Sequence, residues 1–354
     1  MSRAASVASL FEAGPDGLCL SAGAVPSAAE LAALVARLEA RGLLPLYGSL
    51  LQSDDRRDRV DEGFRLALEG ALAAGRAGAM RWEAVIEQVV GALNRVGVEP
   101  ILLKGADLGF HVYPEIGLRT MTDLDLMVRP EELEVAGAAL RDEGFRRIPT
   151  TFSDEWYAIC RWQLPPYAHD ELAVHVDVQA SLLPPYSPYR YVDELDPRNL
   201  RPSRWRGASR LRPELLLWHV VVHSEILHLG HHDHAERATV DLLAMVAAGE
   251  EIDVSWLCGL LTETDTARAL VTGLSRTGTP RELAGLLNSA TRARTWPREA
   301  AVHAVHVARS LVPWWGLPGP RPPDAWYQIY SRPVRLLNAL LRRNPPLQSG
   351  RQDP

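Results

Sequence analysis

The spacing of hydrophobic positions changes twice along the chain and divides it into three regions. In the first region, residues 1–97, apolar side chains recur every three or four positions, which is typical of helices that bury one face. The pattern from Ser27 to Glu30 fits a capping box and predicts a helix that ends at Gly42. Residues 1–26 are small, polar and punctuated by Gly and Pro, and are expected to be loosely held. The other helices of this region are predicted near residues 56–75 and 81–97.

In the second region, residues 98–205, short apolar runs alternate with helical segments. The change from a helical period to a strand period at its start predicts an α/β core. Pro130 and the two acids after it favour the start of a helix. The predicted elements are, in order, a strand at 100–103, a helix at 106–113, a strand at 121–128, a helix at 130–143, and strands at 145–149 and 172–181.

In the third region, residues 206–341, the helical spacing returns and predicts a C-terminal helical domain. Residues 342–354 are polar and contain proline, so we expect a disordered tail. The helices of this region are predicted at 213–229, 235–248, 254–261, 266–274, 281–287, 298–311 and 325–341.

Composition and charge restrict the function classes. Hydrophobic residues make up 47% and charged residues 23%, which is ordinary for a soluble globular protein. The net charge of −6 leaves no global basic field, so nucleic acid is an unfavoured partner. No stretch reaches the roughly 18 apolar residues that a membrane span needs, and no signal peptide is evident. Three widely spaced cysteines fit a reduced complement, and we expect a cytoplasmic protein without a membrane partner.

One lysine stands out among the basic residues. Lys and Arg together number 38, and Lys104 is the single lysine, so the other 37 are arginines. A compact ammonium differs physically from a planar guanidinium. In a chain that strongly favours arginine, lysine should persist where a guanidinium cannot replace the ammonium. Lys104 directly precedes Gly105, where a turn opening a helix would offer backbone N–H groups to a phosphate. Chance retention of a surface lysine is the alternative.

Two aspartates lie in the apolar run that follows. Asp123 and Asp125 are two positions apart in a predicted strand, so both project to one side. Asp177 lies in a later strand that alternates valine with polar residues, and is the natural third acid. Carboxylates are the ligands that hard divalent cations such as Mg²⁺, or Mn²⁺, prefer. The sequence therefore predicts a metal site, against the alternative of solvated acids on exposed strand ends.

The order of these motifs resembles a known family. The segments LLKGADL, GLRTMTDLDLMV, DEGF and VHVDV, and later WHVVVHSEILHL, are similar to poorly characterised bacterial nucleotidyltransferases of the DNA polymerase β superfamily. The resemblance covers roughly residues 30 to 275, on moderately specific motifs. It implies a polymerase β-like α+β core with a mixed sheet, between N-terminal helices and a C-terminal helical domain.

The resemblance also assigns roles to individual residues. It implies that Gly105 is the glycine of the phosphate-binding turn, that Asp123, Asp125 and Asp177 bind the metal and act in catalysis, and that Arg119 belongs to the nucleotide site. Lys104 could neutralise phosphate charge. In this sequence Ala106 stands where the wider superfamily has serine, and Gln179 where histidine is more typical, which puts those two contacts in doubt.

The expected activity is transfer of a nucleoside monophosphate from an NTP to an acceptor hydroxyl or phosphate. A small molecule is favoured over a protein as acceptor because the chain is acidic and shows no basic stripe for RNA. A non-catalytic nucleotide-binding or partner-binding module with the same fold is the alternative. A third hypothesis is a zinc site at His219 and His223, four positions apart on a helix, although their apolar neighbours favour packed core histidines.

Overall fold

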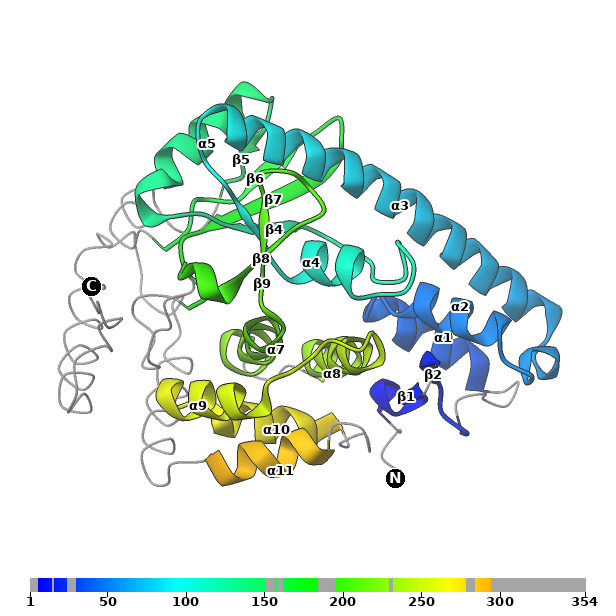
Figure 1. The fold of residues 1–354 in the computed structure, drawn as a ribbon. Coiled ribbons are helices and arrows are strands. Elements are labelled where there is room, and N and C mark those ends of the chain that lie inside the picture. Colours follow the sequence, from blue (N-terminus) through cyan, green and yellow to red (C-terminus); the bar gives the residue numbers. More distant parts are fainter. Residues whose placement is uncertain are drawn as a thin grey trace, which may run out of the picture.

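A seven-stranded mixed sheet forms the centre of the protein, as expected for an α+β fold (Figure 1). The computed structural model describes residues 6–14, 16–23, 30–149, 157, 162–183, 195–228, 232–277 and 284–293. The strand order is β5-β6-β7-β4-β3-β9-β8, and the pairs β4–β7 and β3–β9 are parallel. The strands are β3 (Ile101–Leu102), β4 (Leu124–Met127), β5 (Arg146–Arg147), β6 (Tyr167–His169), β7 (Val174–Gln179), β8 (Leu200–Pro202) and β9 (Ser209–Leu211).

Alternation along the central strands gives each face of the sheet its own core. Leu124 and Leu126 of β4 pack with the second half of helix α3 (Glu62–Arg95) and with α5 (Leu133–Asp142). Met127 belongs to the opposite cluster, which contains helix α7 (Pro213–Val222). Because successive side chains on a strand point to opposite faces, Asp125 lies on the α7 side, together with Met127.

The start of the N-terminal region differs from the prediction in two places. Residues expected to be loosely held form a hairpin of β1 (Phe11–Gly14) and β2 (Gly17–Leu20). Helix α1 (Leu31–Ala40) is followed by α2 (Leu44–Gln52), which was not predicted. The capping residue Ser27 lies outside the described residues.

Helix α3 is one continuous helix of 34 residues where two were predicted. The apolar stripe is interrupted around Gly75 because the helix there passes close to the backbone of another segment. A Cβ atom at Gly75 would lie 2.5 Å from the carbonyl oxygen of Gly117. Small residues at this contact interrupt the hydrophobic periodicity of the sequence, although the helix continues.

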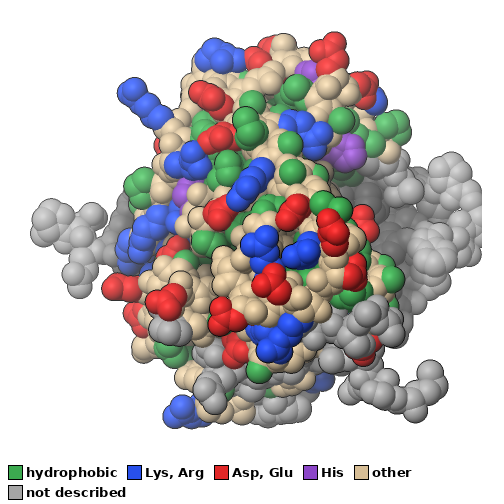
Figure 2. Space-filling view, turned by 90° about the vertical axis from the view of Figure 1, so that its right-hand side faces the viewer, with side chains coloured by type: hydrophobic (Ala, Val, Ile, Leu, Met, Phe, Trp, Pro, Cys, Tyr) green, Lys and Arg blue, Asp and Glu red, His purple; other side chains and the backbone are tan. Residues whose placement is uncertain are grey.

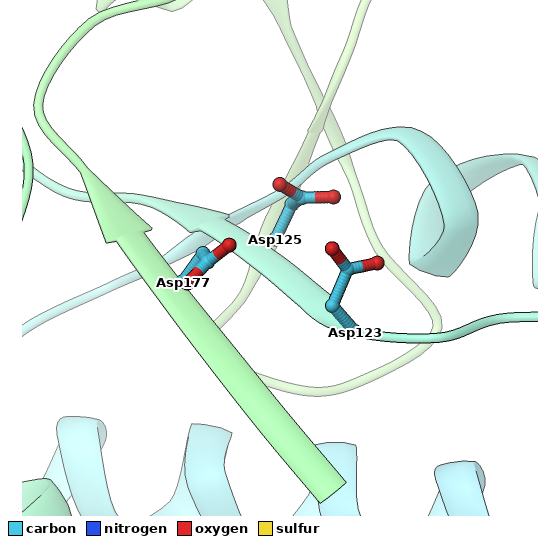
Figure 3. A group of neighbouring side chains, drawn as sticks. All are labelled: Asp123, Asp125 and Asp177. Carbon is cyan, nitrogen blue, oxygen red and sulfur yellow. The ribbon is translucent and has the colours of Figure 1, made fainter. Parts of the chain in front are cut away.

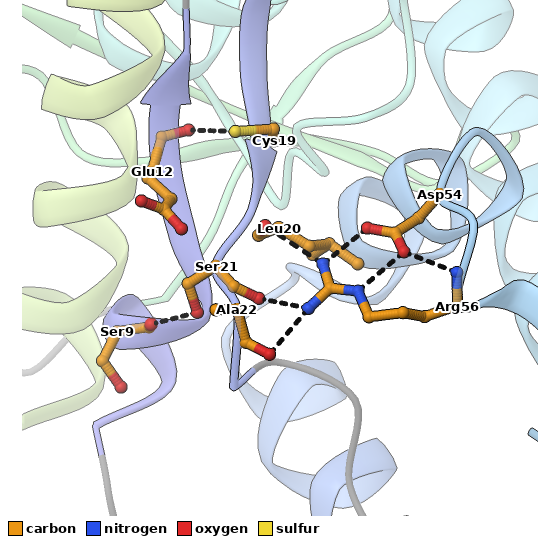
Figure 4. Close-up of polar contacts among 8 residues, drawn as sticks. All are labelled: Ser9, Glu12, Cys19, Leu20, Ser21, Ala22, Asp54 and Arg56. Carbon is orange, nitrogen blue, oxygen red and sulfur yellow. Dashed lines mark hydrogen bonds and ion pairs between the residues drawn. The ribbon is translucent and has the colours of Figure 1, made fainter. Parts of the chain in front are cut away.

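The hairpin is attached to the segment after α2 by one arginine (Figure 4). Arg56 donates through Nη1 to the carbonyl oxygens of Ser21 and Ala22, at 2.6 and 2.8 Å, and through Nη2 to that of Leu20 at 3.2 Å. Asp54 accepts from Nε of the same side chain at 2.7 Å. The carboxylate orients the guanidinium, and the guanidinium satisfies carbonyls at the end of β2.

The C-terminal helices lie on the side of the sheet opposite to α3 (Figure 1). They follow the prediction closely, except that α7 continues into a π-helical turn, His223–Leu227. These helices share one hydrophobic cluster with β1, β2, α1 and α2, so the two ends of the described chain pack together. The predicted helices at 298–311 and 325–341 and the tail at 342–354 lie outside the described residues. The other helices are α8 (His232–Ala247), α9 (Val254–Thr264), α10 (Ala267–Thr277) and α11 (Ala284–Ala293).

Two further observations concern the surface. On the face shown in Figure 2, acidic and basic side chains of the described residues are interspersed rather than gathered by sign. None of the helices in the described part of the chain is long and apolar enough to cross a membrane.

Candidate metal and nucleotide site

Three carboxylates meet on two neighbouring parallel strands, β4 and β7. The register of β4 and β7 places Asp125 directly beside Asp177. Asp123 precedes β4 by one residue and turns its carboxylate toward the other two (Figure 3). One oxygen from each residue lies within 4.8 Å of the others, and no other group of three such ligands occurs among the described residues. The structure thus brings together the three acids that the sequence singled out.

The electrostatics of this triad favour a bound cation. Burial, together with the charges of Asp125 and Asp123, raises the pKa of Asp177 to about 6, and the charge of Lys104 acts in the opposite direction. Burial also raises the pKa of Asp125, while Lys104 lowers it and Asp123 raises it. Three carboxylates this close repel one another, and a divalent cation relieves the repulsion while satisfying the oxygens. The donor set therefore fits Mg²⁺ or Mn²⁺.

Lys104 lies beside the triad. Its Nζ donates to Oδ1 of Asp125 at 2.6 Å, and both side chains are largely buried. Lys104 is the first residue of helix α4 (Lys104–His111), two positions earlier than predicted, and its φ is +42°. Positive φ is uncommon outside glycine and is often found at functional sites. The single lysine therefore occupies an unusual backbone position that directs its ammonium to the acids.

The side chains of Arg119 and Met121 pack closely over Gly105. A Cβ atom at Gly105 would lie 2.8 Å from Nη1 of Arg119 and 3.0 Å from Cγ of Met121. The planar guanidinium thus covers the turn between Lys104 and the rest of α4. Sequence reasoning placed glycine and arginine in one site, and the structure shows them in close approach.

Arg119 has a partner that sequence reasoning missed. Its Nε and Nη2 donate to the two carboxylate oxygens of Asp241 in α8, at 2.8 and 3.0 Å. Tyr113 donates its hydroxyl to the same carboxylate at 2.8 Å. An aspartate flanked by Val240 and Leu242 in an apolar helix was the available signal, because a buried acid needs a partner.

The histidines of the third region form a separate cluster. His219 is fully buried with both ring nitrogens lacking a hydrogen-bond partner within the described structure. Burial lowers its pKa well below the usual range, and the charge of Lys104 acts in the same direction. Nε2 of His223 lies 3.2 Å from Nε2 of His228, whose ring stacks on His234. Among the described residues these imidazoles do not bring three ligand atoms together as the carboxylates do.

Comparisons with known proteins identify a family for the chain. Residues 27–278 match the model of a family described as "Uncharacterised nucleotidyltransferase". No curated protein matches the chain. A solved structure described as that of JHP933 from Helicobacter pylori has 12% sequence identity and a TM-score of 0.30, and the match covers 66% of this chain and 94% of that one. The family match extends over more than half of the chain and includes the triad, Lys104, Arg119 and Asp241.

Proposed function

Since the chain belongs to the family of uncharacterised nucleotidyltransferases, we propose that it transfers a nucleoside monophosphate from an NTP to a hydroxyl or phosphate of an acceptor and releases pyrophosphate. The observation that carries the proposal is the convergence of Asp123, Asp125 and Asp177 within 4.8 Å beside Lys104. Paired acids on neighbouring strands, next to a cation at the first turn of a helix, suit a metal-bound triphosphate.

Each residue of the site has a proposed task. Asp123, Asp125 and Asp177 would hold Mg²⁺ or Mn²⁺, which when bound supplies a Lewis acid for the acceptor oxygen and the phosphates. Asp177 is less buried than Asp125, and its carboxylate would accept the proton of the acceptor hydroxyl. Lys104 would neutralise charge that develops on the departing pyrophosphate, and the N–H groups at Gly105 would bind phosphate oxygens.

A small molecule is the proposed acceptor class. A cavity of about 350 Å³ lies between α3 and α4. Its lining includes Arg119, Thr120 and Met121, which precede Asp123 of the triad in the sequence. Trp82 and Phe110 contribute apolar walls. Its volume suits a compact ligand, since pockets for small molecules begin at roughly 300 Å³. A polypeptide acceptor would need a longer groove.

Pyrophosphate release tests the proposal. Purified protein with Mg²⁺ and each NTP in turn is expected to release pyrophosphate when given a pool of small hydroxyl compounds. Asp123→Asn and Asp125→Asn are expected to abolish release while the variants remain folded at the assay temperature, because each substitution keeps the side-chain shape. Nucleotide binding without turnover in any acceptor pool would instead identify a binding module. If the protein shows no nucleotide binding and no turnover, the nucleotide site itself is refuted.

A further inference from the structure

Helix α8 contacts the backbone segment that leads into the triad. Asp241 receives both hydrogen bonds from Arg119, as described above. One helical turn earlier, Arg237 donates through Nη2 to the carbonyl oxygen of Thr120. The hydroxyl of Thr120 donates to the carbonyl oxygen of Gly42 at 3.1 Å. Residues 119 and 120 are therefore held from the helical side, three to four positions before Asp123.

The contact between Arg119 and Asp241 is buried, and two nitrogens of the guanidinium bind the two oxygens of the carboxylate. Their side chains are 9% and 3% exposed. Nε and Nη2 engage the carboxylate, which leaves Nη1 facing Gly105. A two-pronged contact fixes the plane of the guanidinium as well as its position. Asp241 therefore determines where Arg119 lies over the turn that begins at Lys104.

Charge reinforces this arrangement. Burial lowers the pKa of Arg119, but Asp241 and Tyr113 raise it, and the net shift is upward, so the guanidinium stays charged. Removal of one partner from a buried pair leaves the other charge uncompensated and free to seek a new contact. The charge of Asp125 in the triad already raises the pKa of Arg119. Without Asp241, Asp125 would therefore be the acid that attracts the Arg119 guanidinium.

We propose that Asp241 is a positioning residue of the nucleotide site: through Arg119 it holds the Gly105 turn and residues 120–123 in place, and Arg237 supports the same segment. The inference rests on the proposed function but assigns a task to α8, whose Asp241 lies 122 residues after Arg119 in the sequence. Within the described part of the chain, the hydrogen bonds of Asp241 are with Arg119 and Tyr113, and none joins it to the triad or to the turn. Its effect passes through the guanidinium that covers Gly105.

The test is Asp241→Asn, which keeps the side-chain shape and removes the charge. The KM for NTP is expected to rise about tenfold or more, as is typical when a residue that orients a ligand-binding group is removed. Amide hydrogen exchange at residues 119–125 is expected to become faster. If this variant does not fold, Tyr113→Phe, which removes a single hydrogen bond to the same carboxylate, is expected to show both effects at smaller size.

A matched control is available on the same helix. Glu236 of α8 is also buried and pairs with Arg41, but it anchors the N-terminal segment, where Ser6 donates to it at 2.7 Å. Glu236→Gln is expected to lower stability without raising the KM for NTP or the exchange at 119–125. The inference is overturned if Asp241→Asn leaves both quantities as in the wild type, or if Glu236→Gln changes them equally. A wild type without turnover refutes the proposed function, and the exchange measurement then still decides the role of Asp241.

Discussion

Replacement of Asp177 by asparagine is expected to stabilise the metal-free protein at neutral and alkaline pH. Burial and the charges of Asp125 and Asp123 raise the pKa of Asp177 from 3.8 to about 6 in the folded protein. The folded state therefore holds the proton more tightly than the unfolded state does. Stability must fall as the pH rises between these two values, because the unfolded chain releases the proton first.

The magnitude follows from the shift of about two pKa units. At about 1.4 kcal/mol per unit, the ionised Asp177 lowers the free energy of unfolding by about 3 kcal/mol above pH 6. Partial exposure of the side chain reduces this, so we expect Asp177→Asn to gain about 1–3 kcal/mol at pH 8. The gain should shrink toward zero as the pH is lowered from 8 to 4.

Urea unfolding in EDTA, at a series of pH values, measures the effect. Mg²⁺ should then stabilise the wild type and act much more weakly on Asp177→Asn, since the variant lacks one ligand. Glu87→Gln is the control for a change of one charge, because Glu87 is exposed on α3 and has no ion pair in the described structure. The reasoning is refuted if Asp177→Asn is less stable than the wild type at pH 8 without metal, or if Mg²⁺ stabilises both equally.

Two further substitutions follow from the geometry. Lys104→Arg is expected to lower kcat/KM for NTP by about tenfold or more, because a wide guanidinium cannot reproduce the 2.6 Å contact of the ammonium with Asp125; full activity in steady-state kinetics would contradict the role of Lys104. Gly75→Ala is expected to destabilise by about 2 kcal/mol or more, since its Cβ would meet the Gly117 carbonyl at 2.5 Å. Gly78→Ala on the same helix, with no atom within 4 Å of its Cβ, should be neutral or stabilising in thermal unfolding.

The triad could be predicted from the sequence because its signals are local. Strand alternation alone places Asp123 with Asp125, and separates Asp177 from the valines beside it. Acids within an otherwise apolar strand need a cation or a partner, which points to their chemistry. The pairing of Asp125 with Asp177 in parallel register confirms that they are neighbours. Binding of metal and phosphate by these residues remains a prediction.

The features that were missed depend on contacts between distant segments. Strands of two or three residues, such as β8 and β9, carry too few positions to show alternation and exist because their neighbours pair with them. The continuity of α3 was hidden because its close contact with Gly117 requires small residues. Arg119 was recognised without its partner, since nothing in the local pattern connects it to Asp241.

The most direct test of the proposed reaction compares two radiolabelled forms of the same NTP. With Mg²⁺ and an acceptor pool, label at the α-phosphate should move to the acceptor in amounts equal to the pyrophosphate released, while label at the γ-phosphate should leave with pyrophosphate. Asp125→Asn should abolish both. Transfer of the γ-label to the acceptor, or transfer of the α-label that persists in Asp125→Asn, would contradict the account.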